Sequence, residues 1–245
     1  MTHPLRPSVA LMIAALALTA CTRAEPGAEF NDPYEAQNRA VHQANKDVDR
    51  ALFGSPDSNG VIPTLPKPLA QGLSNVSTNL RGPSNIVNSL LQGRPEPVVS
   101  NAFRFLINST VGLAGLFDPA TVIGLPKDDT DFGETLAVWG APEGAYLEIP
   151  LLGPSTERDM AGKVVDAFLD PVGNLVDAPE SDYIAGVRLG GRIGDRQRFA
   201  DTYESILYGS ADSYAQARLL YLQNRRFELG QEEAVFDPYE DPYGQ

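Results

Sequence analysis

The spacing of hydrophobic positions along the chain predicts short helices rather than strands. The first covers residues 32–53, where Asp32 is expected to cap the helix, Pro33 to be its first residue and Glu35 to complete a capping box. Because two asparagines lie on one face of this helix, we expect that face to contact another helix through hydrogen bonds. Its members are Tyr34, Asn38, Val41, Asn45, Val48 and Leu52.

The next helices are predicted over residues 65–80 and 86–92, because the RGPSN stretch between them is expected to interrupt the chain. Residues 97–109 form a further helix whose polar residues occupy one narrow stripe, made of Asn101, Arg104 and Asn108. So wide an apolar arc is typical either of a helix buried in a large core or of a helix lying in lipid. At about 20 Å, this helix is shorter than the roughly 30 Å hydrocarbon core of a bilayer and does not span it.

An apolar but irregular segment follows at residues 131–159, DFGETLAVWGAPEGAYLEIPLLGPSTERD. Its glycines permit unusual backbone angles and its prolines oppose regular pairing, so we predict a Gly/Pro-rich hairpin or loop. Glu143 and Glu148 are expected on its wet side. A packed connector without a moving part fits the same pattern, and both interpretations stay open. The proposed members of the loop are Gly140, Gly144, Tyr146, Leu147, Ile149, Leu151, Leu152 and Gly153.

The N-terminus has the pattern of an export signal. Residues 1–20 combine Arg6 with the short apolar run VALMIAALALTA, which ends just before Cys21, the only cysteine in the chain. We predict a lipoprotein signal peptide over residues 1–20, acylation of Cys21 and a polar tether over residues 21–30; an ordinary signal peptide with a chance cysteine is the alternative. Because Thr22 rather than aspartate follows the cysteine, we expect a lipid anchor in the periplasmic leaflet of the outer membrane.

Composition limits the partners. The formal charge of −13, or −14 once Arg6 is removed with the signal, argues against nonspecific nucleic-acid binding. Residues 31–230 are long enough for one sizeable domain. Residues 231–245 are acidic and contain proline, which predicts a disordered tail.

Five ordered blocks between residues 31 and 229 resemble the VacJ/MlaA family of outer-membrane lipoproteins. They are NDPYEAQNR, GLSNVSTNLRGPSNIVNSLLQG, RFLINSTVGLAGLFDPA, the segment at 131–159 quoted above and SADSYAQARLLYLQNRRFEL. The resemblance implies an all-α, ring-like single domain of short helices that lie partly in a leaflet. It also implies a central amphipathic channel, through which phospholipid leaves the outer leaflet for a periplasmic carrier protein, and association with an outer-membrane porin trimer.

A stretch near the C-terminal end is regular in a second way. Gly186, Gly190 and Gly194 recur every fourth residue, as do Arg188, Arg192 and Arg196, and the two stripes lie about 200° apart around a helix. The glycine face allows close packing, although three glycines weaken a helix by roughly 1 kcal/mol each, so the segment is expected to be irregular in part. We interpret the three arginines as candidate contacts for phosphate headgroups. A solvated face paired with nearby carboxylates is the alternative.

Enzymatic interpretations find little support. The chain has no GxSxG or HExxH motif, and we predict no catalytic residues, metal site or cofactor. His42, the only histidine left after the signal is removed, is expected on the surface. The predicted function is removal of mislocalised phospholipid from the outer leaflet, which maintains lipid asymmetry. A lipoprotein that scaffolds a porin without a lipid conduit is the alternative, followed by a periplasmic lipid hydrolase.

Overall fold

Helices make up most of the chain in the computed structural model, which describes residues 30–174, 176–177 and 179–231. The predicted signal peptide, Cys21 and nearly all of the predicted tether and acidic tail lie outside these residues. The described part forms one mostly helical domain, with two short hairpins in place of a purely helical fold. In chain order its elements are α2 (Glu35–Phe53), β1 (Gly54–Ser55), β2 (Ser58–Asn59), α3 (Lys67–Leu91), α4 (Pro95–Thr110), α5 (Pro119–Val122), α6 (Phe132–Val138), β3 (Tyr146–Ile149), β4 (Gly153–Thr156), α7 (Glu157–Leu169), α8 (Pro171–Asn174), α9 (Glu180–Arg198), α10 (Ala200–Leu207) and α11 (Ser213–Glu228).

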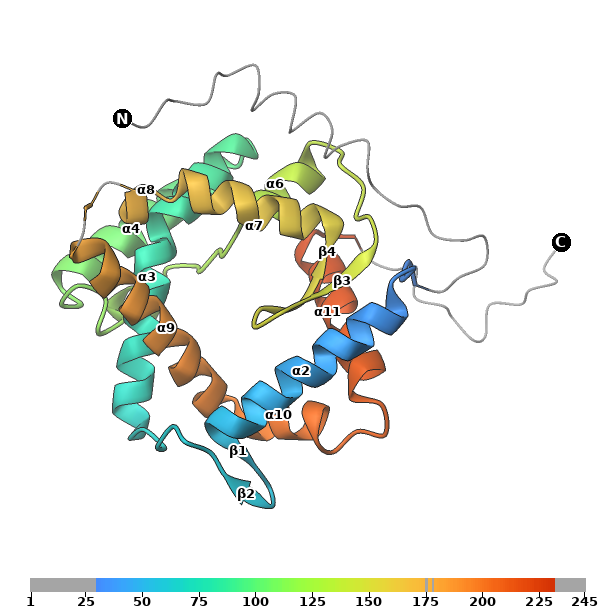
Figure 1. The fold of residues 1–245 in the computed structure, drawn as a ribbon. Helices are drawn as coiled ribbons and strands as arrows, with labels where there is room; N and C mark the ends of the chain where they lie inside the picture. The colour runs from blue at the N-terminus through green and yellow to red at the C-terminus, as the bar shows by residue number, and fades with distance from the viewer. Residues whose placement is uncertain (1–29, 175, 178, 232–245) are drawn as a thin grey trace, which may run out of the picture.

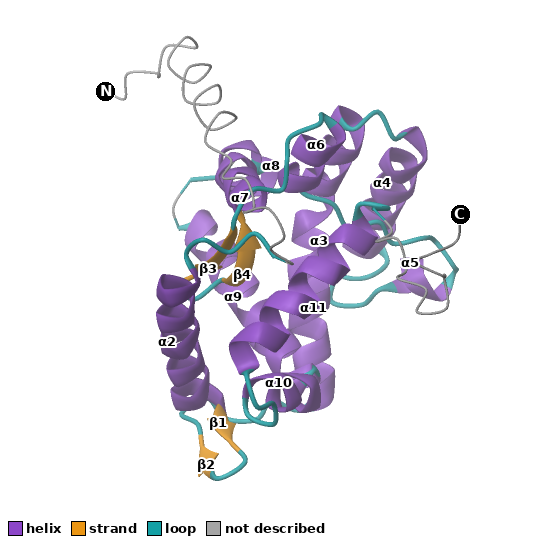
Figure 2. Cartoon of the chain, turned by 90° about the vertical axis from the view of Figure 1, so that its right-hand side faces the viewer, coloured by secondary structure: helices purple, strands orange, loops and turns teal. Residues whose placement is uncertain are grey.

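The elements follow one another around the outline of the molecule in Figure 1. α3 packs against α4 and α9, α6 packs against α7, and α2 lies against β3. The β1–β2 hairpin lies at the opposite end of the molecule from α6 and α8 (Figures 1 and 2). The antiparallel β3–β4 hairpin pairs Tyr146 with Thr156 and Ile149 with Gly153, and its turn points toward the middle of the view in Figure 1.

The predicted interruption of the second helix at residues 81–85 is wrong, because α3 continues through Pro83. A proline inside a helix costs about 3 kcal/mol, so tertiary packing must offset it. Gly82 lies beside Phe105 of α4, where an added Cβ would come within 3.1 Å of the ring, and this close approach holds α3 against α4. Packing therefore overrides the local signal.

Two glycines of α9 pack closely on α3, but only one of them, Gly194, belongs to the predicted stripe, and Gly190 of that stripe makes only an ordinary contact with Leu73. A Cβ added to Gly191 would lie 2.2 Å from the Cβ of Ser77, and one added to Gly194 would lie 2.6 Å from the carbonyl oxygen of Ala70. Gly186 has no such neighbour within 4 Å. The expected irregularity is absent, because α9 is continuous from Glu180 to Arg198. Contact with α3 along one side stabilises a helix that its composition alone would weaken.

Local signals locate some helix ends and miss others. Thr156 caps α7 by accepting a hydrogen bond from the Asp159 amide at 3.2 Å, as expected of a hydroxyl residue directly before a helix. The predicted cap of the first helix is wrong. α2 begins at Glu35 without a side-chain cap, because the Asp32 carboxylate instead accepts from Asn38 at 2.9 Å and from Tyr214 and Arg218.

Candidate functional site

The first component of the site is the β3–β4 hairpin, which contains most of the proposed loop residues. Gly144 and Gly153 have positive φ angles, of 76° and 77°, so their glycine identity suits their backbone. Leu147 and Ile149 are half-buried, whereas Leu151 and Leu152 at the turn are exposed. Leu151 adopts a φ of 62°, a conformation that non-glycine residues rarely adopt. The turn thus exposes apolar side chains, and its unusual backbone conformation must be stabilised by contacts with neighbouring elements.

The base of the hairpin is buried in a small aromatic cluster. Tyr146 packs edge-on against Tyr214 and Tyr221 of α11. Its hydroxyl donates to Glu148 at 2.6 Å. The prediction that Glu148 lies on a wet side is therefore wrong, since its side chain is only 1% exposed. Burial and the neighbouring Glu148 carboxylate raise the pKa of Tyr146, so the phenol stays a hydrogen-bond donor.

The face of α2 toward the hairpin is polar. Asn38 accepts from the Glu148 amide at 2.9 Å and donates to the Tyr146 carbonyl at 3.0 Å. Asn45 accepts from the Leu151 amide at 2.7 Å and donates to the Ile149 carbonyl at 3.0 Å. The two asparagines do form the hydrogen bonds predicted for their face, but their partner is a strand and not a helix.

His42 lies between these asparagines and is buried, which overturns its predicted surface position. Its Nδ1 is 3.3 Å from a Glu148 carboxylate oxygen, and its Nε2 is 3.0 Å from the Ser213 hydroxyl at the start of α11. The residue joins α2, the hairpin and α11. A polar partner for each ring nitrogen explains how a histidine is accommodated there.

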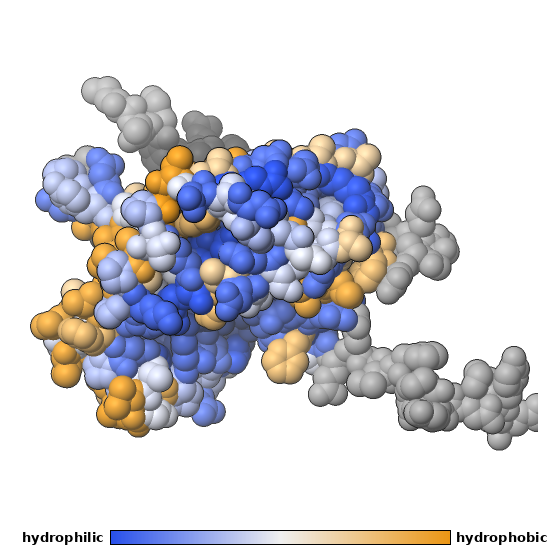
Figure 3. Space-filling view, turned by 90° about the horizontal axis from the view of Figure 1, so that it is seen from below, coloured by the Kyte–Doolittle hydropathy of each residue, from blue (hydrophilic) through white to orange (hydrophobic). Residues whose placement is uncertain are grey.

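The second component is a reversal of the usual distribution of polarity, seen most clearly in α4. Its polar stripe is inside, with Asn101, Arg104 and Asn108 at 5%, 7% and 8% exposure. Its apolar side faces outward, with Phe103 at 51% and Leu106 at 57%. The interpretation of this segment as a buried core helix is therefore wrong. Figure 3 shows the same tendency on one face, where apolar residues lie around the rim, most densely on its left side, and the centre is mostly polar.

Polar residues also line a cavity of about 190 Å³ between α3 and α4. Arg104 donates to Asp118 at 2.9 Å and to the Leu125 carbonyl at 2.7 Å, and so ties α4 to the loop that follows it. The lining includes Ser74, Asn75, Asn79, Asn85, Asn101, Arg104, Asn108, Lys127 and Arg198. The lining also includes the carboxylates Asp118 and Asp129, which pair with Arg104 and Lys127. Such a set of amides and ion pairs suits water or a polar group rather than an acyl chain.

The three arginines of α9 differ in their surroundings. Arg188 forms a bidentate pair with Asp170. Arg196 pairs with Asp49 at 2.6 and 2.9 Å. Arg192 is exposed and, within the described residues, has neither an ion pair nor a hydrogen bond. Among the three, Arg192 is thus the cation open to an anionic ligand without competition from a carboxylate.

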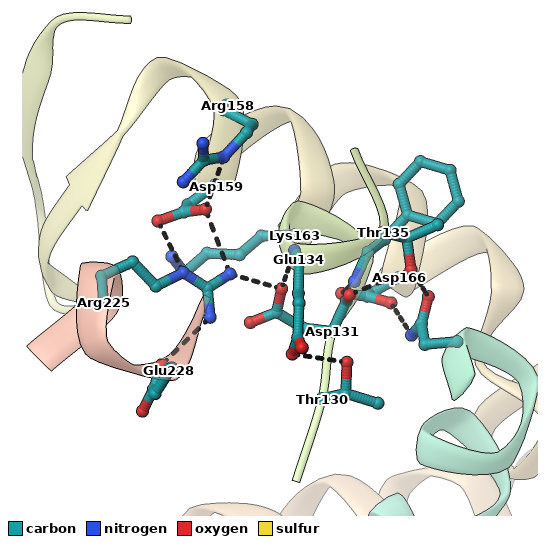
Figure 4. A network of polar contacts seen from close by, with 12 residues as sticks. Thr130, Asp131, Glu134, Thr135, Arg158, Asp159, Lys163, Asp166, Arg225 and Glu228 are labelled. Atoms are coloured by element: carbon teal, nitrogen blue, oxygen red, sulfur yellow. Dashed lines mark hydrogen bonds and ion pairs between the residues drawn. The ribbon is translucent and has the colours of Figure 1, made fainter. Parts of the chain in front are cut away.

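A buried ionic network holds this arrangement together (Figure 4). Arg225 of α11 donates to Asp131 at 2.6 Å and to both oxygens of Asp159, at 3.1 and 3.2 Å. Burial alone would raise the pKa of Asp159, but Arg225 and the Tyr221 hydroxyl hold it below its ordinary value. Asp131 also caps α6 by accepting from the Glu134 amide. α11 thereby joins α6 to α7.

Two other carboxyl groups of the network have a raised pKa, in contrast to Asp159. Burial raises the pKa of Glu134, even though Thr130 donates to it and Arg94 lies 3.0 Å away. Burial likewise raises the pKa of Asp166, which accepts from Asn88 and from a backbone amide of α6. Through these hydrogen bonds Asp166 joins α7 to α3 and α6, and Glu134 joins α6 to the start of α4.

The comparison with protein families decides which known proteins this arrangement resembles. A family model described as MlaA lipoprotein matches residues 30–228. The chain belongs to the MlaA lipoprotein family. The match includes the hairpin, α4 and α9, and it ends close to the last residue of α11.

Relatives of the MlaA family extend the match over nearly the whole chain. A Haemophilus influenzae protein named intermembrane phospholipid transport system lipoprotein MlaA is 30% identical over 224 residues, which are 89% of this chain and 88% of the relative. The Escherichia coli protein of that name is 31% identical over 218 residues, 88% of this chain and 84% of its own. A solved structure described as the structural basis for maintenance of bacterial outer membrane lipid asymmetry has a TM-score of 0.66 and 28% identity, covering 81% of this chain and 98% of its own.

Within this MlaA-family chain, the sequence analysis missed the contact of α2 with the hairpin. Asn38 and Asn45 are seven residues apart, a spacing that does identify one helical face. Their partners are more than 100 residues away, and no pattern in the sequence names them. In the described part of the chain, no helix is long and apolar enough to cross a membrane. The same residues contain no cluster of side chains suited to hold a metal ion.

Proposed function

We propose that this protein is the outer-membrane lipoprotein of an intermembrane phospholipid transport system and that it acts without catalysis. It removes mislocalised phospholipid from the outer leaflet and passes it to a periplasmic carrier protein, which maintains lipid asymmetry. Membership of the MlaA family supports this, as do the phospholipid transport named for its relatives and the lipid asymmetry named for its structural neighbour.

The reversed polarity of α4 is the observation that carries the proposal. Exposed apolar side chains such as Phe103 and Leu106 are stable in contact with acyl chains, whereas water would oppose them. With 16 residues, α4 is about 24 Å long, shorter than the roughly 30 Å of a hydrocarbon core. The helix therefore lies within one leaflet, which we assign to the periplasmic leaflet of the outer membrane. The anchor predicted at Cys21 directs the protein there.

The domain is ring-like in this proposal, and phospholipid moves through a passage that its inner surface lines. A lipid headgroup needs polar contacts, while its tails need an apolar wall. The amides and ion pairs between α3 and α4 provide the first, and the exposed turn of the hairpin, Leu151 and Leu152, provides the second. Arg192 is the headgroup contact with no competing carboxylate, and Arg188 and Arg196 would contact phosphate only by exchanging a carboxylate partner.

The partners follow from the same position. A phospholipid that leaves the outer leaflet must reach the inner side of the membrane, and a porin trimer offers a rigid barrel wall against which a leaflet-embedded protein can pack. The exposed apolar side chains along α4 suit such a wall as well as they suit lipid. A soluble periplasmic carrier then receives the lipid.

Lipid contact is tested with nitroxide labels on the acylated full-length protein in outer-membrane vesicles. Labels on Phe103→Cys and Leu106→Cys should be relaxed by oxygen and protected from a water-soluble nickel complex, because both side chains face acyl chains. A label on Glu180→Cys, at the exposed start of α9, is the aqueous control. Strong relaxation of the first two labels by the nickel complex would refute the proposed position.

Transport is tested in cells that lack their own MlaA-family protein. The variant Arg192→Glu should let phospholipid accumulate in the outer leaflet, while Arg81→Glu, which reverses an exposed arginine on α3, should not. Equal accumulation in both variants would show a general effect of charge. If phospholipid accumulates in neither variant, Arg192 does not contact the headgroup in the passage.

A further inference from the structure

The contact between α2 and β3 has the geometry of strand pairing without a strand. One edge of β3 pairs with β4. On its other edge, the Asn38 side chain accepts from the Glu148 amide and donates to the Tyr146 carbonyl, two residues apart. The backbone N–H and C=O of a single residue on a neighbouring parallel strand make this same pair of bonds. Asn45 repeats the pattern further along, toward the Leu151 amide and the Ile149 carbonyl.

This contact also differs from the other junctions of the domain in its charge. Arg218 meets Asp32, Arg196 meets Asp49, and Arg225 meets Asp159, so each of these junctions includes an arginine–carboxylate pair. The buried carboxylate of the hairpin is Glu148. Within the described part of the chain it pairs with no arginine or lysine, and its partners are His42, Asn45 and Tyr146. The bonds of Asn38 and Asn45 to the hairpin backbone are neutral, and neutral hydrogen bonds are roughly half as strong as the guanidinium–carboxylate bonds of the other three junctions.

The turn beyond this junction stores strain. Leu151 has a φ of 62° and is 74% exposed, so few contacts of its own side chain hold it there. Its amide donates to the Asn45 side chain at 2.7 Å, the shortest of the four bonds between the two asparagine side chains and the hairpin backbone. Loss of that bond lets the turn relax to a more favourable backbone conformation. Asn45 thus controls the part of the hairpin that projects toward the centre of the domain in Figure 1.

We propose that Asn38 and Asn45 are positioning residues that act as a stand-in strand, hold the hairpin against α2, and thereby set how readily phospholipid moves through the passage. The effect on phospholipid movement rests on the proposed function, whereas the contact between the asparagines and the hairpin does not. The paired amides keep the turn in its resting position, and their release lets the turn swing away from α2. A weaker contact should then increase the rate of lipid movement rather than abolish it.

The first experiment measures amide hydrogen exchange in the acylated full-length protein. Asn45→Ala should accelerate exchange at the Leu151 amide about tenfold, and Asn38→Ala should do the same at the Glu148 amide. Gln43→Ala is the matched control, because Gln43 lies on the exposed side of α2 and bonds only to Asp47. Exchange that is unchanged in both asparagine variants would overturn the inference, whatever the transport result.

The second experiment measures removal of outer-leaflet phospholipid by the same variants. Asn45→Ala should raise the rate at least twofold and Gln43→Ala should leave it unchanged. Faster exchange with a wild-type rate would overturn the role in transport. A wild-type protein that moves no lipid would refute the proposed function, and the exchange measurement would still decide whether the amides hold the hairpin.

If Asn45→Ala fails to fold, a reversible disulfide between α2 and the turn tests the same inference. The double variant Asn45→Cys with Leu151→Cys replaces the amide contact by a disulfide at the same place. Oxidised and reduced forms of this one protein are compared after the crosslink is verified by mass. Faster lipid removal in the reduced form supports the inference, and equal rates in the two forms overturn it.

Discussion

Replacement of Arg225 should reveal how much of the stability depends on the buried ionic network. In Arg225→Met, the Asp159 carboxylate, whose side chain is 3% exposed, loses both of its bonds to the guanidinium. Breaking a buried pair from one side destabilises a protein by about 3–5 kcal/mol. The pairs with Asp131 and Glu228 add little, because those carboxylates are 46% and 48% exposed. For a domain of this size each kcal/mol lowers Tm by about 2–4 °C, so we expect a decrease of roughly 6–20 °C.

The assay is thermal unfolding of the acylated protein in one detergent, followed by circular dichroism. Arg39→Met is the matched control, because Arg39 bonds to Glu35 and Asp212 at the surface, where all three side chains are 40–48% exposed. Its Tm should fall by no more than a few degrees. In Arg225→Met, Asp159 keeps the Arg158 guanidinium at 3.5 Å and the Tyr221 hydroxyl, so the decrease is expected in the lower part of the range of roughly 6–20 °C. Equal losses in Arg225→Met and Arg39→Met would refute this account of the network.

Further predictions concern the anchor, the lipid-facing helix, the hairpin and one buried acid. Cys21→Ser should leave the protein unlipidated, and mass spectrometry of outer-membrane fractions checks this; normal outer-membrane protein with an unmodified residue 21 would contradict it. Phe103→Asp or Leu106→Asp should weaken membrane association measured by extraction, since a charge on the outer side of α4 opposes acyl contact. A disulfide from Leu147→Cys to a cysteine placed opposite it on a neighbouring helix should stop lipid flux until it is reduced, and full flux in the crosslinked protein would mean that the hairpin is static. Because burial raises the pKa of Glu134 in the folded protein, its contribution to stability is present at low pH and is lost as pH rises through the folded value; Glu134→Gln should therefore gain stability relative to wild type between pH 4 and 7 in denaturant titrations, and a constant difference would contradict this.

Features of the chain that depend on local chemistry could be predicted from the sequence. The cap at Thr156 needs only a hydroxyl before a helix, and the end of α7 needs only the Asp170–Pro171 pair. The polar stripe of α4 follows from helical spacing alone. The direction in which that stripe faces does not follow from spacing, because a helix with one polar face fits an aqueous surface, a core or a membrane.

Features that depend on distant partners could not be predicted. Asp32 has every local property of a helix cap, yet its carboxylate accepts hydrogen bonds from Tyr214 and Arg218, which are more than 180 residues away. Pro83 has every local property of a helix breaker, yet α4 and α9 hold α3 together across it. His42 and Glu148 bury each other's polar groups only because α2 and the hairpin meet. In each case the energy of a tertiary contact exceeds a local preference of about 1–3 kcal/mol.

The reversed polarity and the ionic junctions have one physical cause in the proposed membrane position. Where acyl chains surround a domain, burying an apolar side chain gains little, since lipid is as apolar as a protein core. Helices must then be joined by contacts that lipid cannot replace, namely hydrogen bonds and ion pairs shielded from water. The junctions at Asp32, Asp49 and Asp159 are of this kind. The same polar interior supplies contacts for a lipid headgroup. The groups that hold the domain together would therefore also stabilise a headgroup at its centre. The hairpin is then the natural moving part, because within the described residues its contact with α2 contains no arginine–carboxylate pair and its backbone is held by the neutral side-chain amides of Asn38 and Asn45.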